Sequence, residues 1–235
     1  RSLGVRMLVG GAVSLGVGLL AAAVAVAIGT LYGTVAAYAG GRVDAVLMRV
    51  VDVLYGLPTI LMVVLLAVAA DSLVDGWVNR TSERAAFVEA SGTSGFEIQT
   101  RASELFPARE LSAMTRTALD LGVLLVAIGG VSWLTMARVV RGQVLSLKSQ
   151  PFVEAARAIG ASPARIFMRR LLPNLVETVA VYGTLAVSQA VLSESFLSFL
   201  GVGVRPPLPS WGVLCADGLP ELNPYRSNWW LLVFP

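Results

Sequence analysis

The sequence predicts an all-α protein whose helices form a polytopic transmembrane bundle. Of its 235 residues, 56% are hydrophobic and only 14% are charged, whereas an ordinary soluble domain has about 25% charged residues. The charges are also clustered, so that long stretches of the chain carry few or none. Because a transmembrane helix needs about 20 consecutive apolar residues, this distribution argues against a water-soluble globule.

Four stretches are long and apolar enough to cross a bilayer, and a fifth begins near the C-terminus. The first lies in a region, residues 7–41, that has no charged side chain. The predicted spans are Ala12–Tyr38, Val53–Ala70, Leu121–Ala137 and Leu175–Leu200, with the start of a fifth at Trp229. We expect Pro58 to kink the second span, because proline removes a backbone hydrogen bond from a helix.

The loops predict the orientation of these spans. Residues 138–174 contain six arginines and one lysine against a single glutamate, which places this loop in the cytoplasm by the positive-inside rule. Residues 71–116 contain five arginines and seven acidic residues and are expected outside. By alternation, the turn at residues 40–44 is cytoplasmic and the loop at residues 201–228 is extracytoplasmic.

This orientation divides the chain into three parts. Residues 1–70 form the first two transmembrane helices, and residues 71–116 form an extracytoplasmic insertion with short helices at about 83–90 and 102–116. The insertion is either a tolerated surface segment or a docking surface for an external partner. Residues 117–235 contain the remaining transmembrane helices, the cytoplasmic loop and the second outer loop.

Residue usage excludes several kinds of chemistry. The chain has no histidine and a single cysteine, Cys215, so it has no Ser-His-Asp site, no His-ligated zinc and no thiolate cluster. The only lysine, Lys148, follows Leu147, where a phosphate-binding loop needs glycine. We therefore expect no catalytic site, metal or cofactor, and any ATP that drives the protein would bind another polypeptide. The net charge of +3 gives no indication of a nucleic-acid partner.

The cytoplasmic loop contains an amphipathic helix followed by a sharp corner. Its apolar stripe consists of Phe152, Ala155, Ala156 and Ile159. Gly160 suits the left-handed position after a helix, and Ser162 with Pro163 suits the start of a new helix running toward Leu172, which Pro173 should end. The first helix either lies on lipid headgroups or fills a groove on a soluble partner, and its small residues favour the partner.

Two motifs resemble a known family of transporters. Glu154-Ala155-Ala156, three further residues, Gly160, and then Leu172-Pro173 resemble the EAA loop of permease subunits of ATP-binding-cassette importers. The segment from Ser193 to Gly212, with its run Pro206-Pro207-Leu208-Pro209-Ser210-Trp211-Gly212, looks like the segment characteristic of the dipeptide, oligopeptide and nickel branch. Residues 38–44 and 49–52 are similar to the second, C-type permease of that branch. The resemblance covers nearly the whole chain apart from residues 71 to about 116.

The resemblance implies the type I importer permease fold, with a cytoplasmic coupling helix and six spans. On this basis the chain is a fragment that lacks the first span and most of the last. Relatives often have histidine where this chain has Arg170, so the second helix of the loop is expected to meet its partner differently.

The resemblance also implies a function and a set of partners. The complete importer would contain two permeases, two ATPase subunits and an extracytoplasmic solute-binding protein in a prokaryotic inner membrane. Glu154 would make a polar contact with the ATPase, Ala155 and Ala156 would allow close packing, and Gly160 would form the corner, with Leu172 and Pro173 completing the motif. Cargo could be peptides, nickel or another small solute.

Polar residues at membrane depth are candidates for the transport pathway or for contacts within the bundle. They are Asp52, Ser193 and Glu194. An ion-coupled secondary carrier that uses Asp52 and Glu194 is the alternative function. An intramembrane enzyme is a third hypothesis, for which Ser193-Glu194-Ser195 is the nearest candidate nucleophile and base.

Overall fold

The computed structural model describes residues 3–91, 96–205, 208–223 and 226–233, which are almost entirely helical. The α-helices are α1 (Leu3–Ala39), α2 (Gly41–Tyr55), α3 (Thr59–Asn79), α4 (Thr81–Ala90), α5 (Phe96–Leu105), α6 (Ala113–Lys148), α7 (Pro151–Ala158), α8 (Pro163–Ile166), α9 (Leu172–Phe199), α10 (Trp211–Gly218) and α11 (Trp230–Val233). Between α8 and α9 lies a π-helical turn, η1 (Phe167–Leu171), and after α10 a short 3₁₀ turn, η2 (Leu219–Glu221). The only described strands, β1 (Leu222–Asn223) and β2 (Arg226–Ser227), form a short antiparallel pair, so the predicted all-α helical bundle is confirmed.

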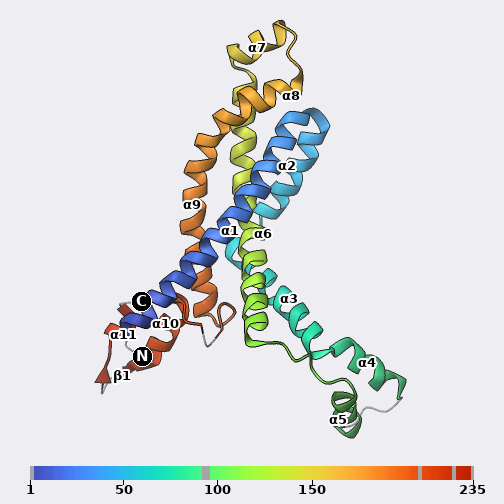
Figure 1. Cartoon of the computed structure of the whole chain (residues 1–235), viewed down its shortest axis with the longest axis vertical. Helices are drawn as coiled ribbons and strands as arrows, with labels where there is room; N and C mark the ends of the chain where they lie inside the picture. The colour runs from blue at the N-terminus through green and yellow to red at the C-terminus, as the bar shows by residue number, and fades with distance from the viewer. Residues whose placement is uncertain (1–2, 92–95, 206–207, 224–225, 234–235) are drawn as a thin grey trace.

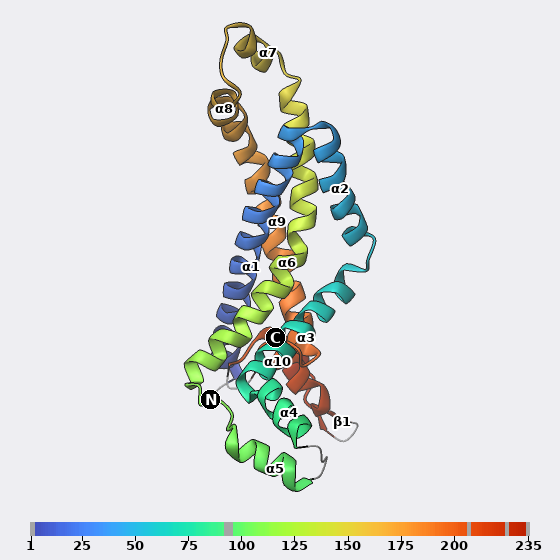
Figure 2. The same cartoon turned by 90° about the vertical axis from the view of Figure 1, so that its right-hand side faces the viewer.

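Four helical stretches of the described chain are long and apolar enough to cross a membrane. They are Leu3–Ala39, Thr59–Asn79, Met114–Lys148 and Pro163–Phe199. The turn between α1 and α2 lies toward the same end of the molecule as α7 and α8, whereas α4, α5 and α10 lie toward the opposite end (Figure 1, Figure 2). The predicted fifth span corresponds to the short helix α11.

Helices α1 and α6 pack closely along the centre of the bundle, and glycines permit the close approach. A Cβ atom at Gly29 would lie 2.5 Å from the Cβ of Met136, and one at Gly33 would lie 2.3 Å from the carbonyl oxygen of Ala137. Small residues four positions apart bring backbones together in membrane helices, where van der Waals packing drives association. The pair Gly29 and Gly33 therefore sets the distance between the two helices.

The largest buried cluster joins four helices. Its members come from α1, α3, α6 and α9, together with the loop after α9. They include Val17, Ala21, Val63, Ala67, Leu124, Ala127, Ile128, Val131, Ala190, Leu197 and Val204. Because α3 and α9 both pack on this α1–α6 core, the four long helices form one bundle.

The second span differs from its prediction in two respects. The helix is interrupted at residues 56–58, where only a kink was expected, and Pro58 immediately precedes the first residue of α3. Helix α3 then continues past Asp71 to Asn79, because its charged residues find partners at the end of the bundle. The predicted turn at residues 40–44 is also shorter, since only Gly40 separates α1 from α2.

The insertion contains two short helices, but the second was predicted in the wrong place. Helix α4 matches the prediction at 83–90, whereas α5 spans Phe96–Leu105 and the chain then leaves helical geometry until α6. Ser112 begins α6 as an N-cap, its Oγ accepting a hydrogen bond from the Thr115 amide at 3.2 Å. Residues 92–95 and the prolines at 206 and 207 lie outside the described residues.

The loop predicted to be cytoplasmic is shorter than expected at both ends. Helix α6 continues to Lys148, so residues 138–148 belong to the bundle. The expectation that Pro173 interrupts the helix is wrong, because α8, η1 and α9 form one continuous helical stretch from Pro163 to Phe199. The non-helical part of the loop is thus confined to two short links, before and after α7.

Candidate functional site

Residues 149–171, hereafter the elbow, form the end of the molecule that carries α7 (Figure 1). Helix α7 ends in a Schellman motif, in which the Gly160 amide donates to the Arg157 carbonyl at 2.9 Å and the Ala161 amide to the Ala156 carbonyl at 3.0 Å. Gly160 has φ = +75°, a left-handed conformation that glycine adopts without a Cβ penalty. The corner predicted at this glycine is confirmed.

The second limb of the elbow begins as the sequence predicts. The Ser162 side chain accepts a hydrogen bond from the Arg165 amide at 3.4 Å, and Pro163 occupies the first turn of α8. Serine at the N-cap satisfies a free amide, and proline in the first turn has no amide to satisfy. Both limbs are therefore fixed by their own local sequence.

Helix α7 is packed against the second limb through one face. Val153 is fully buried and Ala156 nearly so, in a cluster with Ile166 and Leu171. The predicted apolar stripe is wrong on this point, because Ala156 belongs to the packed face and Val153 was not included. The elbow is consequently a small packed unit with a core of its own.

Other apolar residues of α7 and its C-cap point away from this core. Phe152, Ala155 and Ile159 are exposed, and Ile159 is 86% accessible. Positions i, i+3 and i+7 share one helix face, so these three residues form an outward apolar stripe, hereafter the outer stripe. An exposed apolar surface on a preformed helix is a typical feature of a protein interaction site.

The six residues of the EAA-like motif lie partly on the elbow and partly just after it. Glu154, Ala155, Ala156 and Gly160 lie on α7 and its corner; Leu172 and Pro173 lie in the first turn of α9. Glu154 is exposed and forms no ion pair with any described residue. Its carboxylate is therefore free to meet a partner.

Pro173 is accommodated in the helix by the π turn that precedes it. The Leu172 amide donates to the carbonyl of Phe167, five residues earlier, and the Asn174 side-chain amide donates to the Arg170 carbonyl at 2.6 Å. A π turn and a side-chain donor supply the hydrogen bonds that proline disturbs. This local compensation explains why the helix continues.

Glu194 is fully buried near the end of α9 and binds serine hydroxyls. Ser198 Oγ donates to its carboxylate at 2.7 Å, and Ser195 Oγ lies at 3.4 Å. The Ser198 hydroxyl in turn accepts a hydrogen bond from the Val204 amide at 3.0 Å. Glu194 and Ser198 thus clamp the end of α9 to the loop that follows it.

Asp52 and Ser193 lie in other surroundings. Asp52, on α2, forms an ion pair with Arg138 of α6 at 2.9 Å, and its side chain is 59% exposed. Ser193 lies on α9 beside a groove, one residue before Glu194 but only partly buried. Asp52 and Glu194 therefore have separate partners and do not form one carboxylate cluster, which removes the geometric basis for a shared ion-coupling site.

Residues 14–228 match the family model described as "Binding-protein-dependent transport system inner membrane component". This chain belongs to that family. It is thus a multi-pass membrane component of a transport system, as the motifs and the four apolar helices predicted.

Relatives of this family member include named peptide transport proteins. Over all 235 residues the chain is 37% identical to the dipeptide transport system permease protein DppC of Bacillus subtilis, of which it covers 58%. Over the same length it is 39% identical to the oligopeptide transport system permease protein OppC of Escherichia coli K12, of which it covers 61%. Over 217 residues, 92% of the chain, it is 33% identical to the glutathione transport system permease protein GsiD of Escherichia coli O6:K15:H31, covering 56% of that protein. The chain therefore spans about three fifths of the length of these relatives.

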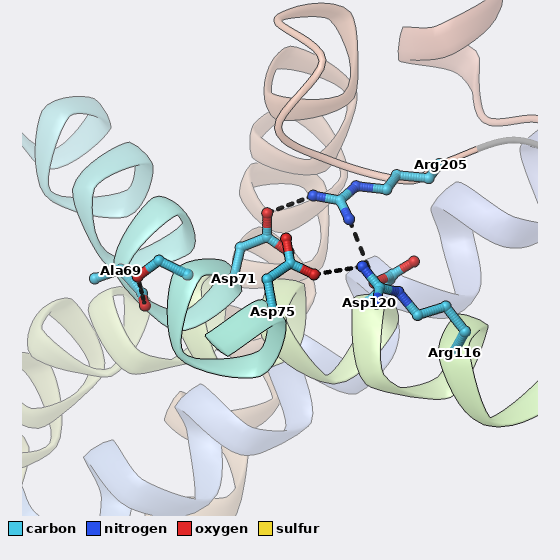
Figure 3. A network of polar contacts seen from close by, with 7 residues as sticks. Ala69, Asp71, Asp75, Arg116, Asp120 and Arg205 are labelled. Atoms are coloured by element: carbon cyan, nitrogen blue, oxygen red, sulfur yellow. Dashed lines mark hydrogen bonds and ion pairs between the residues drawn. The ribbon is translucent and has the colours of Figure 1, made fainter. Parts of the chain in front are cut away.

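At the opposite end from the elbow lies a network of five charged residues, hereafter the outer charge network (Figure 3). Its members are Asp71 and Asp75 of α3, Arg116 and Asp120 of α6, and Arg205 of the loop after α9. Arg205 pairs with Asp71 and lies 4.0 Å from Asp120, while Arg116 pairs with Asp75 and lies 3.5 Å from Asp120. The network ties the loop after α9 to both helices.

A groove with a volume of about 420 Å³ runs between α3 and α9. Its walls are mostly aliphatic, and Gln189 and Ser193 supply the polar groups. The lining residues are Ile60, Val63, Val64, Gln189, Leu192, Ser193, Phe196 and Leu197. Ser193 therefore borders an open space, whereas the neighbouring Glu194 is turned into the bundle.

Sequence reasoning missed the outer charge network and the glycine contact between α1 and α6. Opposite charges at the ends of two predicted spans and in one outer loop were a signal for the network, because charges at a bundle end usually pair. Gly29 and Gly33, four positions apart in an apolar helix, were a signal for the contact.

Proposed function

We propose that this chain forms the membrane pathway of an ATP-driven, binding-protein-dependent importer and is coupled to a separate ATPase through the elbow. The observation that carries the proposal is the outer stripe of α7, an apolar face at the end of the bundle with no partner among the described residues. Small Ala155 in this stripe allows a partner backbone to come close, and exposed Glu154 beside it supplies a polar contact. Such a helix fits a groove on a soluble protein.

The packed face of α7 makes the elbow suitable for transmitting force. Val153 and Leu171 connect α7 to the start of the long helix α9, so a partner that displaces α7 also displaces that helix. In this function the elbow end is cytoplasmic, in agreement with its excess of arginine. Residues 71–116 and 201–228 are then extracytoplasmic.

The further partners follow from the same proposal. They are two ATPase subunits, which hydrolyse the ATP, a second and homologous permease, and an extracytoplasmic solute-binding protein. The names of the relatives support a di- or oligopeptide, or a related small solute, as cargo. Asp52 supports the bundle through Arg138 in this scheme, and Ser193 borders the pathway.

The test is to fill the outer stripe with a bulky side chain in the assembled transporter. Ala155→Trp should weaken the binding of the ATPase subunits by about 5- to 150-fold, because a large side chain in a close contact costs about 1 to 3 kcal/mol. Uptake of a labelled dipeptide should fall with it. Ala86→Trp is the matched control, since Ala86 is exposed on α4 at the opposite end.

The two variants separate the elbow from general damage to the protein. Unchanged ATPase binding in Ala155→Trp would show that α7 is not the coupling helix. Equal loss of binding in both variants would show that the effect is not specific to the elbow, and would also count against the proposal.

A further inference from the structure

A cavity of about 340 Å³ lies where the elbow meets the ends of α1 and α6. It is lined by Tyr38 and Lys148 from the ends of the two long helices and by residues of both limbs of the elbow. The latter are Val153, Arg157, Ala161, Pro163, Ile166 and Leu171. The cavity thus combines two cationic side chains with an apolar wall.

Both cations lack a carboxylate partner among the described residues. Lys148 Nζ donates to the Ala37 carbonyl at 2.9 Å and lies 3.4 Å from the Tyr38 carbonyl and 5.5 Å from the centre of the Tyr38 ring. These contacts position the ammonium group, whose charge also helps to lower the pKa of Asp44, although the two groups form no direct ion pair. Arg157 is exposed and forms no ion pair with a described residue.

The surroundings of the cavity increase its positive potential. The elbow also carries Arg165, Arg169 and Arg170, and its only acidic residue is Glu154. By contrast, Arg138 and Arg141 of α6 are paired with acids of α2. Most of the unpaired positive charge at this end of the described chain is therefore on the elbow, and the rest is on Arg42 and Arg49 of α2.

The cavity lies beside the ends of two long apolar helices, α1 at Ala39 and α6 at Lys148. The inference rests on the proposed function in one respect, since it takes this end of the helices as the cytoplasmic one. Tyr38 packs edge-on against Phe167 beside the cavity, with ring centres 5.8 Å apart, and tyrosine is enriched where spans end at a membrane surface. A molecule bound here would have its polar part beside the cations and its apolar part against the bundle.

We propose that this cavity binds the phosphate headgroup of an anionic phospholipid. Basic pockets between transmembrane helices on the cytoplasmic side bind such headgroups. Lys148 and Arg157 would contact the phosphate, and the aliphatic side chains of Val153, Ile166 and Leu171 would face the glycerol and the first acyl carbons. Inorganic phosphate would meet the same cations but would gain nothing from the apolar wall.

The proposal is tested by measuring lipid retention on the purified full chain. Native mass spectrometry would compare phosphatidylglycerol with phosphatidylcholine of identical acyl chains. Each basic residue near a membrane surface strengthens binding of anionic lipid by about fivefold, so Arg157→Gln should reduce the preference for phosphatidylglycerol by about fivefold. Arg49→Gln is the control, because Arg49 is exposed on α2, has no ion pair among the described residues and does not line the cavity.

Charge-conserving variants distinguish binding from damage to the fold. The double variant Lys148→Arg and Arg157→Lys should retain most of the preference for phosphatidylglycerol, whereas Lys148→Gln with Arg157→Gln should remove it. Equal preference in the wild type and the double glutamine variant would overturn the proposal. Displacement of the lipid by millimolar inorganic phosphate would overturn the assignment to a lipid.

Discussion

Gly160→Ala should loosen the corner of the elbow without removing any side-chain contact. Gly160 has φ = +75°, and a Cβ atom there would meet no other atom within 4 Å. The cost is therefore purely conformational, and a residue with a Cβ pays about 1 to 2 kcal/mol in the left-handed region. Gly142→Ala is the matched control, since Gly142 also has open space around it but lies inside helix α6.

The two alanine variants should change stability in opposite directions. Gly142→Ala should stabilise α6 slightly, because alanine is favoured over glycine in a helix by up to about 1 kcal/mol. Gly160→Ala should open the elbow locally and increase amide hydrogen exchange there by about 5- to 30-fold. The informative amides are those of residue 160 and Ala161, which donate to Arg157 and Ala156 in the Schellman motif.

Hydrogen exchange followed by mass spectrometry, on the full chain in detergent, resolves these segments. Gly160→Asn should give an intermediate result, because asparagine tolerates the left-handed conformation better than alanine does. If Gly160→Ala left exchange in residues 151–161 unchanged, the left-handed corner would not be what orients α7. If exchange rose equally throughout α6 and α9, the change would be a global destabilisation.

Two further predictions concern the bundle. Gly33→Ala would place a Cβ atom 2.3 Å from the Ala137 carbonyl oxygen and should lower the free energy of unfolding, measured by thermal denaturation, by about 1 to 3 kcal/mol. Gly16→Ala is the control and should cause no such loss, because a Cβ atom there would have no neighbour within 4 Å. Equal melting temperatures for the two variants would refute the close contact. Asp44 accepts hydrogen bonds from the Arg141 guanidinium, which lowers the pKa of Asp44. The stabilisation of the folded protein by this pair is therefore fully present above the unfolded-state pKa of about 3.9, and it is lost as the pH falls through the lower folded-state pKa. Asp44→Asn should remove this acid dependence from melting curves, and an unchanged profile would show that the pair does not contribute.

Local sequence predicted the elbow because each of its signals acts within a few residues. Gly160, Ser162 and Pro163 each satisfy or avoid a backbone requirement at a helix end, and all three have the expected geometry. The faces of α7 were harder to assign, since periodicity shows that a helix is amphipathic but not which side its own protein covers. Val153 and Ala156 are buried only because the second limb folds back on them.

For features that depend on several segments, the sequence shows which residues are charged or small but not which segments meet. The outer charge network needs α3, α6 and the loop at Arg205 to meet at one end of the bundle. The predicted end of the second span was wrong for the same reason. Asp71 ends the apolar run in the sequence but does not end helix α3, because Arg205 neutralises its charge. The continuity through Pro173 depends on a π turn, for which single-sequence patterns give no dependable signal.

The helical stretch from Pro163 to Phe199 connects the two ends of the molecule. Its 37 residues would extend about 55 Å as an α-helix. At the elbow end, Leu171 is buried against Val153 of α7, so the π turn and α7 are packed as one unit.

At the other end, Glu194 and Ser198 clamp the helix to the loop that carries Arg205. Arg205 in turn pairs with Asp71 of α3. In the proposed function, an ATPase that moves α7 would thus act on a helix that is anchored at both ends, and the displacement would reach the outer loop unless the span itself bends. The absence of proline between Asn174 and Phe199 argues against such a bend. In the proposed function, the helical stretch Pro163–Phe199 would therefore transmit a displacement of the elbow to the outer charge network.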